Sequence, residues 1–256
     1  HLMERAAILE ADHVATGHYA QLERTSEGVL LKKAVDASKD QSYVLFGMGQ
    51  EQLSRTLMPV GAYPKSEIRQ MAEDAGLLIA AKPDSQDICF IPSGDYKVFL
   101  KQRLTTTPGD IVELDGMVVG QHEGIEYFTI GQRRGLGVAE GEPRFVVRIE
   151  PESRRVVIGP ESALMRNEMR VSDVKYPLGT APDGPVEVNV KIRYKSNEAA
   201  AVLHPEGDGA VIRFIRPQRS VTPGQAAVFF QGDVLLGGGT IEPSVELSVN
   251  QPTATP

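Results

Sequence analysis

The single cysteine of this 256-residue chain, Cys89, is the side chain best suited to nucleophilic chemistry, because a thiolate is a strong nucleophile. Pro83 and Pro92 bracket it. Since proline fixes its own φ and turns the preceding residue away from helix, the segment is predicted to be an extended loop or short strand that presents the thiol. A lone cysteine is also often a small buried hydrophobic residue without chemistry, and the local sequence leaves both interpretations open.

Gly17 and His18 follow a predicted short strand over residues 12–16. Ligands bind at the carboxyl ends of strands in open α/β sheets, which makes both residues candidates for ligand contact. A surface histidine in a loop is the alternative interpretation of His18. An amphipathic helix that runs to Glu10 precedes the strand. A helix leading into a buried strand is the back half of a βαβ unit, whose sheet needs further strands, so we expect the sequence to be a fragment.

Two groups of basic residues lie in the second half of the chain. The first is the pair Arg133 and Arg134, set among glycines that let a backbone approach a partner closely. Guanidinium groups suit phosphate, and a charged hairpin tip is the alternative. The second group comprises Lys191, Arg193, Lys195, Arg213, Arg216 and Arg219. Because strand side chains repeat with period two, we predict that its first three members share one face of a strand and, with Tyr194 nearby, face a nucleic-acid backbone; a solvated sheet face is the alternative.

Length and composition describe a globular protein of ordinary composition. A chain of 256 residues usually forms two or three domains, and its 41% hydrophobic and 24% charged residues are typical values. The net charge of −7 argues against a protein that is basic as a whole, without excluding a local basic face. One cysteine excludes an intramolecular disulfide framework and a cysteine-based zinc site. The sequence shows no signal-peptide pattern and no apolar run that could span a bilayer, so we expect a cytoplasmic protein with no membrane partner.

The elements that must position these residues change in kind along the chain. The spacing of Ile68, Met71, Ala72 and Ala75 predicts a helix over residues 65–75 whose apolar stripe packs into a core. Strands are predicted over 21–24 and 29–33, a polar run at 39–41 leads into an apolar segment, and a short helix is predicted over 96–104. From residue 108 onward, short runs of Val, Ile, Phe and Tyr alternate with turn residues, which indicates small β-domains or barrels with a boundary near 161–166.

Five motifs that contain the candidate residues occur in order along the chain. They are ATGHYA at 15–20, KDQSY at 39–43, KPDSQDICFI at 82–91, TIGQRRGLG at 129–137 and TPGQAAVF at 222–229. Together they closely resemble the bacterial tRNA-specific 2-thiouridylases over residues 2–241. The resemblance implies a truncated adenine-nucleotide α-hydrolase-like α/β domain, then a small central β-domain, then a C-terminal β-barrel. We assign these domains to residues 1–104, 105–162 and 163–245, and a tail to 246–256.

The resemblance also implies an activity and the residues that carry it. Members of this family use ATP and Mg²⁺ to activate the C2 oxygen of the wobble uridine 34 in tRNA, then replace it with sulfur that is relayed as a persulfide from a sulfur-carrier protein. By this resemblance, Cys89 is catalytic and carries the persulfide, and Gly17 lies against ATP. The positions that match tRNA contacts are His18, Lys39, Asp40, Gln41, Arg193, Tyr194 and Gln225. No metal ligand is assigned.

Two parts of the family pattern do not occur in the sequence. These are the phosphate-binding loop with its Ser-Gly-Gly-x-Asp-Ser pattern and a second catalytic cysteine. We therefore expect that this polypeptide alone does not bind ATP productively or thiolate tRNA. Two alternatives are a stand-alone tRNA-binding module, in which Cys89 has no chemistry, and a thiol sulfur-carrier protein that needs no nucleotide. Salt-dependent tRNA binding that is insensitive to thiol reagents favours the first, and persulfide loading of Cys89 without RNA favours the second.

Overall fold

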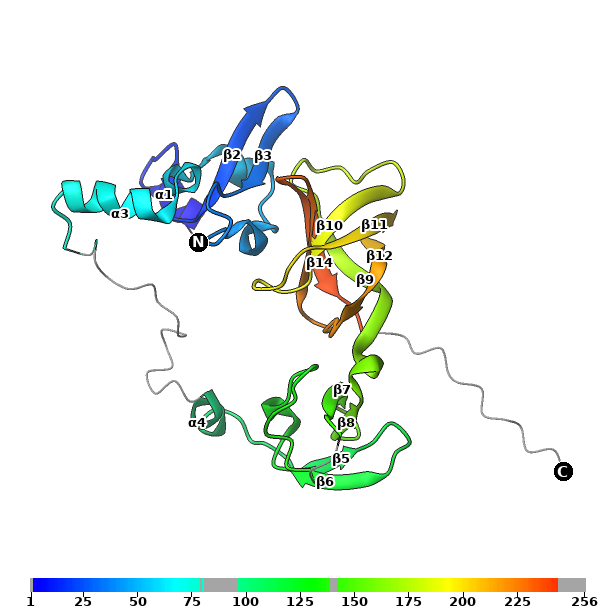
Figure 1. The fold of residues 1–256 in the computed structure, drawn as a ribbon. Coiled ribbons are helices and arrows are strands. Elements are labelled where there is room, and N and C mark those ends of the chain that lie inside the picture. The colour runs from blue at the N-terminus through cyan, green and yellow to red at the C-terminus, as the bar shows by residue number, and fades with distance from the viewer. Residues whose placement is uncertain (1, 79, 81–95, 139–141, 244–256) are drawn as a thin grey trace. The chain divides into compact units, whose positions relative to one another are not determined.

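Two compact units make up the chain (Figure 1). The computed structural model describes residues 2–78, 80, 96–138 and 142–243, so Cys89 and its motif lie outside the described residues. The first unit comprises His1–Pro64, Asn167–Arg216 and Thr222–Pro256, and the second comprises Lys65–Arg166 and Pro217–Val221. The second unit is therefore an insertion that separates two parts of the first in the sequence.

The first unit contains a closed barrel of six strands (Figure 1). The strands are β9 (Met165–Lys175), β10 (Val186–Lys191), β11 (Ala199–Glu206), β12 (Gly209–Arg219), β13 (Ala226–Gln231) and β14 (Val234–Ile241). Their order is β13-β10-β11-β12-β9-β14, and antiparallel pairing of β13 with β14 closes the barrel. In β11 the buried residues are Ala199, Ala201 and Leu203, which is the period-two alternation expected of a strand with one face in a core.

A hairpin from the start of the chain joins this barrel. Strands β2 (Ala20–Thr25) and β3 (Gly28–Lys33) pair antiparallel, and β3 continues the sheet beside β14. The backbone N–H of Lys33 donates to the carbonyl of Asp233. One hydrophobic cluster consequently combines residues from both ends of the chain, among them Leu31, Tyr43, Leu45, Leu53, Val228, Phe230 and Leu235.

The side chain of Gln50, the first residue of α2 (Gln50–Ser54), fastens the hairpin to the segment between β9 and β10. Its Oε1 accepts from the N–H of Val29 at 2.8 Å, and its Nε2 donates to the carbonyls of Val29 at 2.9 Å and Pro177 at 2.8 Å. One amide thus satisfies three backbone groups from two parts of the sequence that lie more than a hundred residues apart.

The remaining N-terminal residues form a small α/β arrangement. Helix α1 (Leu2–Ile8) precedes β1 (Val14–Ala15), which pairs in parallel with β4 (Thr56–Leu57), and the 3-10 helices η1 (Ser42–Leu45) and η2 (Pro59–Ala62) lie in the connections. Parallel sheets are normally covered on both faces. The side chains of Leu2, Ile8 and Leu9 are 66%, 80% and 76% exposed, so no described residue covers this apolar side of α1.

The second unit is built around a four-stranded sheet. Its strands are β5 (Gly109–Val112), β6 (Val118–His122), β7 (Phe145–Glu150) and β8 (Arg155–Gly159), in the order β6-β5-β8-β7. The unit also contains α3 (Lys65–Asp74), α4 (Tyr96–Lys101), η3 (Ile125–Tyr127) and η4 (Glu161–Leu164). Ile111, Leu136, Val146, Val156 and Ile158 form its main hydrophobic cluster.

Two expectations about local structure are wrong. The helix predicted over 65–75 is confirmed as α3, but the prediction that its apolar stripe packs into a core is wrong. None of its residues is buried and Met71 is 43% exposed, because no described element packs on this stripe. Strand β10 ends at Lys191, so Arg193 and Lys195 do not continue it as a basic stripe. The reason is a turn, in which Ser196 donates its N–H and its hydroxyl to the carbonyl of Arg193 and replaces the ladder hydrogen bonds of a strand.

Candidate functional site

Asp40 determines the conformation of the loop that follows β3. Its side chain is buried, and both carboxylate oxygens accept hydrogen bonds from the loop itself. Oδ1 accepts from the N–H groups of Ala34 at 3.0 Å and Ser42 at 3.2 Å, and Oδ2 accepts from the Ser42 hydroxyl at 2.9 Å. A turn in which Asp36 accepts from the N–H and the hydroxyl of Ser38 precedes it. The carboxylate of Asp40 therefore holds the loop in one shape.

Gln41 ties this loop to the segment that carries Gly17 and His18. Its backbone N–H donates to the carbonyl of Tyr19 at 2.8 Å, and its Oε1 accepts from the N–H of Tyr19 at 2.9 Å. Nδ1 of His18 lies 3.1 Å from the hydroxyl of Thr16. Gly17 is exposed, and a side chain built there would meet nothing within 4 Å. The backbone of Gly17 is therefore open to a ligand.

Tyr43 connects the same loop to the barrel. Its hydroxyl donates to the carbonyl of Ala226 at 2.9 Å. Ala226 is the residue that follows Gln225. Its ring centroid lies 6.1 Å from that of Tyr194, with an angle of 54° between the ring planes, a tilted arrangement that aromatic pairs favour. Tyr43 thus brings Tyr194 and Gln225 to the loop that contains Lys39, Asp40 and Gln41.

Arg193 lies at the start of the turn that follows β10. Its Nη2 donates to the hydroxyl of Thr222 at 2.8 Å, and its backbone N–H donates to the hydroxyl of Ser196 at 3.3 Å. Thr222 begins the turn that leads through Gln225 into β13, since the N–H of Gln225 donates to the carbonyl of Thr222. The two turns are therefore held together by the guanidinium group.

A pocket of about 500 Å³ lies between the Asp40 loop and the turn after β10. Its lining residues are Ala37, Ser38, Asp40, Lys191, Tyr194, Lys195, Ser196, Asn197 and Glu198. Lys33 forms an ion pair with Glu198 at 2.7 Å and thereby neutralises one acidic group of the lining. Lys191 and Lys195 supply positive charge, and the ring of Tyr194, 40% exposed, supplies a flat apolar face. This combination suits a nucleotide, with its phosphate near the lysines and its base on the ring.

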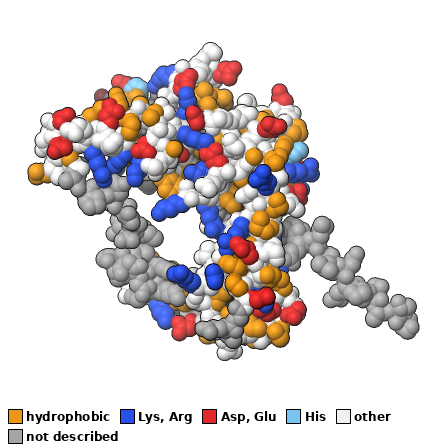
Figure 2. Space-filling model, viewed as in Figure 1, with side chains coloured by type: hydrophobic (Ala, Val, Ile, Leu, Met, Phe, Trp, Pro, Cys, Tyr) orange, Lys and Arg blue, Asp and Glu red, His pale blue; other side chains and the backbone are white. Residues whose placement is uncertain are grey.

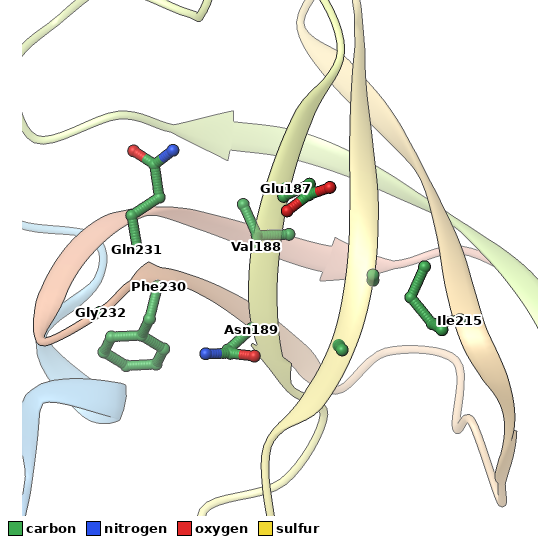
Figure 3. A pocket seen from close by; sticks show the side chains of 9 residues that line it. Glu187, Val188, Asn189, Ile215, Phe230, Gln231 and Gly232 are labelled. Carbon is green, nitrogen blue, oxygen red and sulfur yellow. The ribbon is translucent and has the colours of Figure 1, made fainter.

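A second pocket of similar volume lies on the barrel and has a different chemistry (Figure 3). Glu187, Asn189 and Gln231 are its charged or amide-bearing lining residues, and the rest of the lining is apolar or glycine. Because it contains a carboxylate and no Lys or Arg, it is unsuited to a phosphate. Figure 2 shows basic and acidic side chains interspersed on the visible face of the molecule, so a phosphate site depends on local groups such as Lys191 and Lys195.

The pKa values of two tyrosines reflect their places in this site. Burial raises the pKa of Tyr43 above its ordinary value of 10.0, and the nearby charge of Arg193 lowers it in part. Burial also raises the pKa of Tyr194, the charge of Asp40 adds to the rise, and that of Lys39 opposes it. Both hydroxyls are consequently neutral at physiological pH and can donate hydrogen bonds.

Replacing Tyr43 by phenylalanine is expected to lower the free energy of unfolding by about 0.5–1.5 kcal/mol at pH 8, because the hydrogen bond to the carbonyl of Ala226 is lost. The pKa of Tyr43 is raised in the folded protein, so its contribution is fully present below pH about 10 and is lost as the pH rises through the folded pKa. Urea titrations at several pH values should therefore show a smaller alkaline loss of stability in Tyr43→Phe than in the wild type.

The matched control is Tyr63→Phe, which removes a hydroxyl from a tyrosine of the same unit that is 38% exposed. Its stability should follow that of the wild type at every pH. Equal alkaline profiles for the wild type and Tyr43→Phe would contradict the contribution assigned to Tyr43.

The structure brings most of the predicted site residues into one unit. Gly17, His18, Lys39, Asp40, Gln41, Arg193, Tyr194 and Gln225 all belong to the first unit. Cys89 lies outside the described residues. The sequence analysis did not assign Tyr43, Thr222 or Ser196 to the site; the first two stand inside the quoted motifs, whereas no local signal indicates Ser196.

Comparisons with known proteins match most of the chain, in three segments, to domains of tRNA-modifying proteins. Residues 1–93 match the tRNA methyl transferase HUP domain, residues 97–160 the tRNA methyl transferase PRC-barrel domain, and residues 166–241 the aminomethyltransferase beta-barrel domain. These three matches confirm the predicted fold class, an α/β domain followed by a central β-domain and a C-terminal β-barrel.

Individual relatives define the family within this class. The chain is 46% identical over 255 residues to the tRNA-specific 2-thiouridylase MnmA of Heliobacterium modesticaldum, 45% identical over 245 residues to that of Pelotomaculum thermopropionicum, and 44% identical over 250 residues to that of Desulforamulus reducens. These alignments cover 97%, 94% and 96% of this chain and 66%, 67% and 68% of the relatives, so the chain spans about two thirds of their length. The chain belongs to the family of tRNA-specific 2-thiouridylases, which confirms the resemblance found in its motifs.

Proposed function

We propose that this chain supplies the tRNA-binding and sulfur-carrying parts of a tRNA-uridine 2-sulfurtransferase, which transfers persulfide sulfur to C2 of the wobble uridine 34 in an ATP-dependent reaction. The observation that carries the proposal is the pocket between the Asp40 loop and the turn after β10, which is lined by Lys191, Lys195 and the exposed ring of Tyr194. Membership in the family supports the reaction type. Across the described residues, no helix has the length and apolarity to cross a membrane.

Two of the proposed tRNA contacts, Asp40 and Tyr194, line that pocket. Lys39 and Arg193 provide charge for phosphate, and Tyr194 provides a ring on which an unstacked base can lie. His18, Gln41 and Gln225 are the remaining predicted contacts. Asp40 supports binding by holding the loop, because its carboxylate oxygens are occupied by Ala34 and Ser42.

Cys89 is proposed to carry the sulfur. A sulfur-carrier protein passes a sulfur atom from its own persulfide to the thiolate of Cys89, which becomes a persulfide. The terminal sulfur attacks C2 of the uridine, a C–S bond forms, and the activated C2 oxygen leaves. A second thiolate then attacks Sγ of Cys89, which breaks the S–S bond, leaves the sulfur on C2 and forms a new disulfide with Cys89. Since Cys89 is the only cysteine of this sequence, that second thiol comes from outside it.

Gly17 is the residue of this chain that we assign to ATP. Its exposed backbone, with open space around it, follows the carboxyl end of β1 and fits a nucleotide that approaches closely. ATP supplies the group that makes the C2 oxygen of the base a leaving group. The described residues include no group of three or more His, Cys, Asp or Glu side chains that could hold a metal ion, so no residue of this part is assigned to Mg²⁺.

The test is tRNA binding by this chain at several salt concentrations, together with mass spectrometry of Cys89 after exposure to a persulfide donor. The proposal expects salt-dependent binding of tRNA and the addition of one sulfur atom to Cys89. Binding without sulfur uptake would favour the stand-alone RNA-binding module, and sulfur uptake without binding would favour the sulfur-carrier protein. The absence of both would overturn the proposed function.

A further inference from the structure

The loop between η3 and β7 in the second unit is fixed by hydrogen bonds. The N–H of Gly131 donates to the carbonyl of Val146 at 2.8 Å, and the N–H of Val146 donates to the carbonyl of Gln132 at 2.9 Å. The side chain of Gln132 accepts from the N–H of Thr129 at 3.0 Å and donates to the carbonyl of Arg134 at 2.9 Å. The backbone on both sides of Arg133 is thus held in place.

Buried residues and glycines anchor the same loop. Leu136 is buried in the main cluster of the unit, beside Val146. Gly131 has a φ of 87°, and a side chain there would collide with Ser220, so only glycine fits that position. Gly135 has a φ of 73°. Between these anchors the loop tip stays at the surface, with Arg133, Arg134 and Gly135 all exposed.

Arg133 and Arg134 differ from other arginines of the unit in their surroundings. Arg144 pairs with Glu113 at 2.9 Å, Arg148 with Glu150 at 2.8 Å and Arg219 with Glu161 at 3.0 Å. Neither Arg133 nor Arg134 forms an ion pair with a residue of the described ranges. Among the described residues, no carboxylate therefore pairs with these two adjacent positive charges. The loop that carries them is rigid, so few degrees of freedom must be fixed on binding.

We propose that the Arg133–Arg134 loop binds the phosphate backbone of tRNA, as a second RNA contact on a different unit from the pocket at Tyr194. This inference rests on the proposed function. Guanidinium groups match phosphate oxygens with paired N–H donors, and a glycine at the tip lets the backbone come close. The tip residues 132–135 contain no apolar side chain. A protein interface would need an apolar or aromatic anchor at its centre, whereas a phosphate backbone does not.

The test compares two double variants of this chain in tRNA binding. Arg133→Gln with Arg134→Gln should weaken binding about tenfold or more at low salt and reduce the slope of log K against log salt by about 1 to 2, the effect of losing one or two phosphate contacts. The control is Arg154→Gln with Arg155→Gln, which removes an adjacent, exposed arginine pair from the same unit. It should keep the wild-type slope and affinity within about twofold.

Each outcome separates the inference from the proposed function. Absence of tRNA binding by the wild type would overturn the proposed function itself. If the wild type binds tRNA and the Arg133/Arg134 variant binds it with the same affinity, only the inference is overturned. The inference is also overturned if both double variants lose the same affinity, because the loss would then follow from net charge alone. Reduced sulfur uptake from the carrier protein with unchanged tRNA affinity would overturn it in favour of a protein partner. Thermal unfolding of both variants should match the wild type, because the changed side chains are exposed.

Discussion

Replacing Cys89 by serine is expected to abolish sulfur transfer. The chain should gain one sulfur atom on exposure to a persulfide donor, and Cys89→Ser should gain none, because a hydroxyl cannot hold a sulfane sulfur. When the chain is extended by the phosphate-loop segment of a full-length relative, thiolation of tRNA should fall by about 10³-fold or more, the scale of loss when a covalent nucleophile is removed. The measurements are intact-mass spectrometry and the formation of 2-thiouridine.

Ser85→Ala is the matched control for this experiment, because it changes a hydroxyl-bearing residue of the same motif and leaves the thiol. It should load sulfur as the wild type does. The affinity for tRNA should be the same in all three proteins, since the proposed RNA contacts lie elsewhere. Undiminished thiolation by Cys89→Ser would remove Cys89 from the mechanism.

Replacing Asp40 by alanine is expected to reduce both stability and tRNA affinity. The N–H groups of Ala34 and Ser42 would lose their acceptor in a buried place, and each unsatisfied donor costs about 1–3 kcal/mol, so the free energy of unfolding should fall by about 2–6 kcal/mol. A loosened loop should weaken tRNA binding about tenfold or more, because the loop must be ordered again on binding. Urea unfolding and tRNA titration measure the two effects.

The sign of the change in affinity distinguishes a positioning role from a charge effect. Removing a negative charge near RNA should by itself strengthen binding. Asp36→Ala removes the same charge from the same loop but breaks exposed hydrogen bonds to Ser38 in place of buried ones, so it should cost less stability than Asp40→Ala and leave binding equal or slightly tighter. If Asp40→Ala bound tRNA as tightly as Asp36→Ala, Asp40 would have no positioning role.

Local signals in the sequence predict elements, whereas the contacts between elements depend on distant residues. The hairpin β2–β3 and helix α3 follow from alternation and helical spacing, which are properties of consecutive residues. The exposure of Met71 on α3 could not be predicted in this way, because burial depends on what packs against the helix. The alternating pattern of β10 predicts a strand that continues through Arg193. The turn there could not be predicted, because it depends on hydrogen bonds between the hydroxyl of Ser196 and the backbone of Arg193.

The site shows the same division. The five motifs contain Gly17, His18, Gln41 and Gln225, but of the residues that line the pocket only Asp40 lies in a motif. No local pattern joins Tyr43 to Ala226, which are 183 residues apart, or Arg193 to Thr222. Tyr43 meets Ala226 because β3 joins the barrel beside β14, and Arg193 meets Thr222 because the end of β10 pairs with the start of β13.

The discontinuity of the first unit has a consequence for the order in which a newly made chain can fold. Leu31 packs in one cluster with Phe230 and Leu235, so this cluster is completed only when the last strands have left the ribosome. At about 5–20 residues per second, this delay is on the order of 10 s. The inserted unit has nearly all its residues in one stretch and can fold in the meantime. Until then the nascent hairpin lacks the part of its core that β13 and β14 supply, and Leu31 and Val29 are only partly covered.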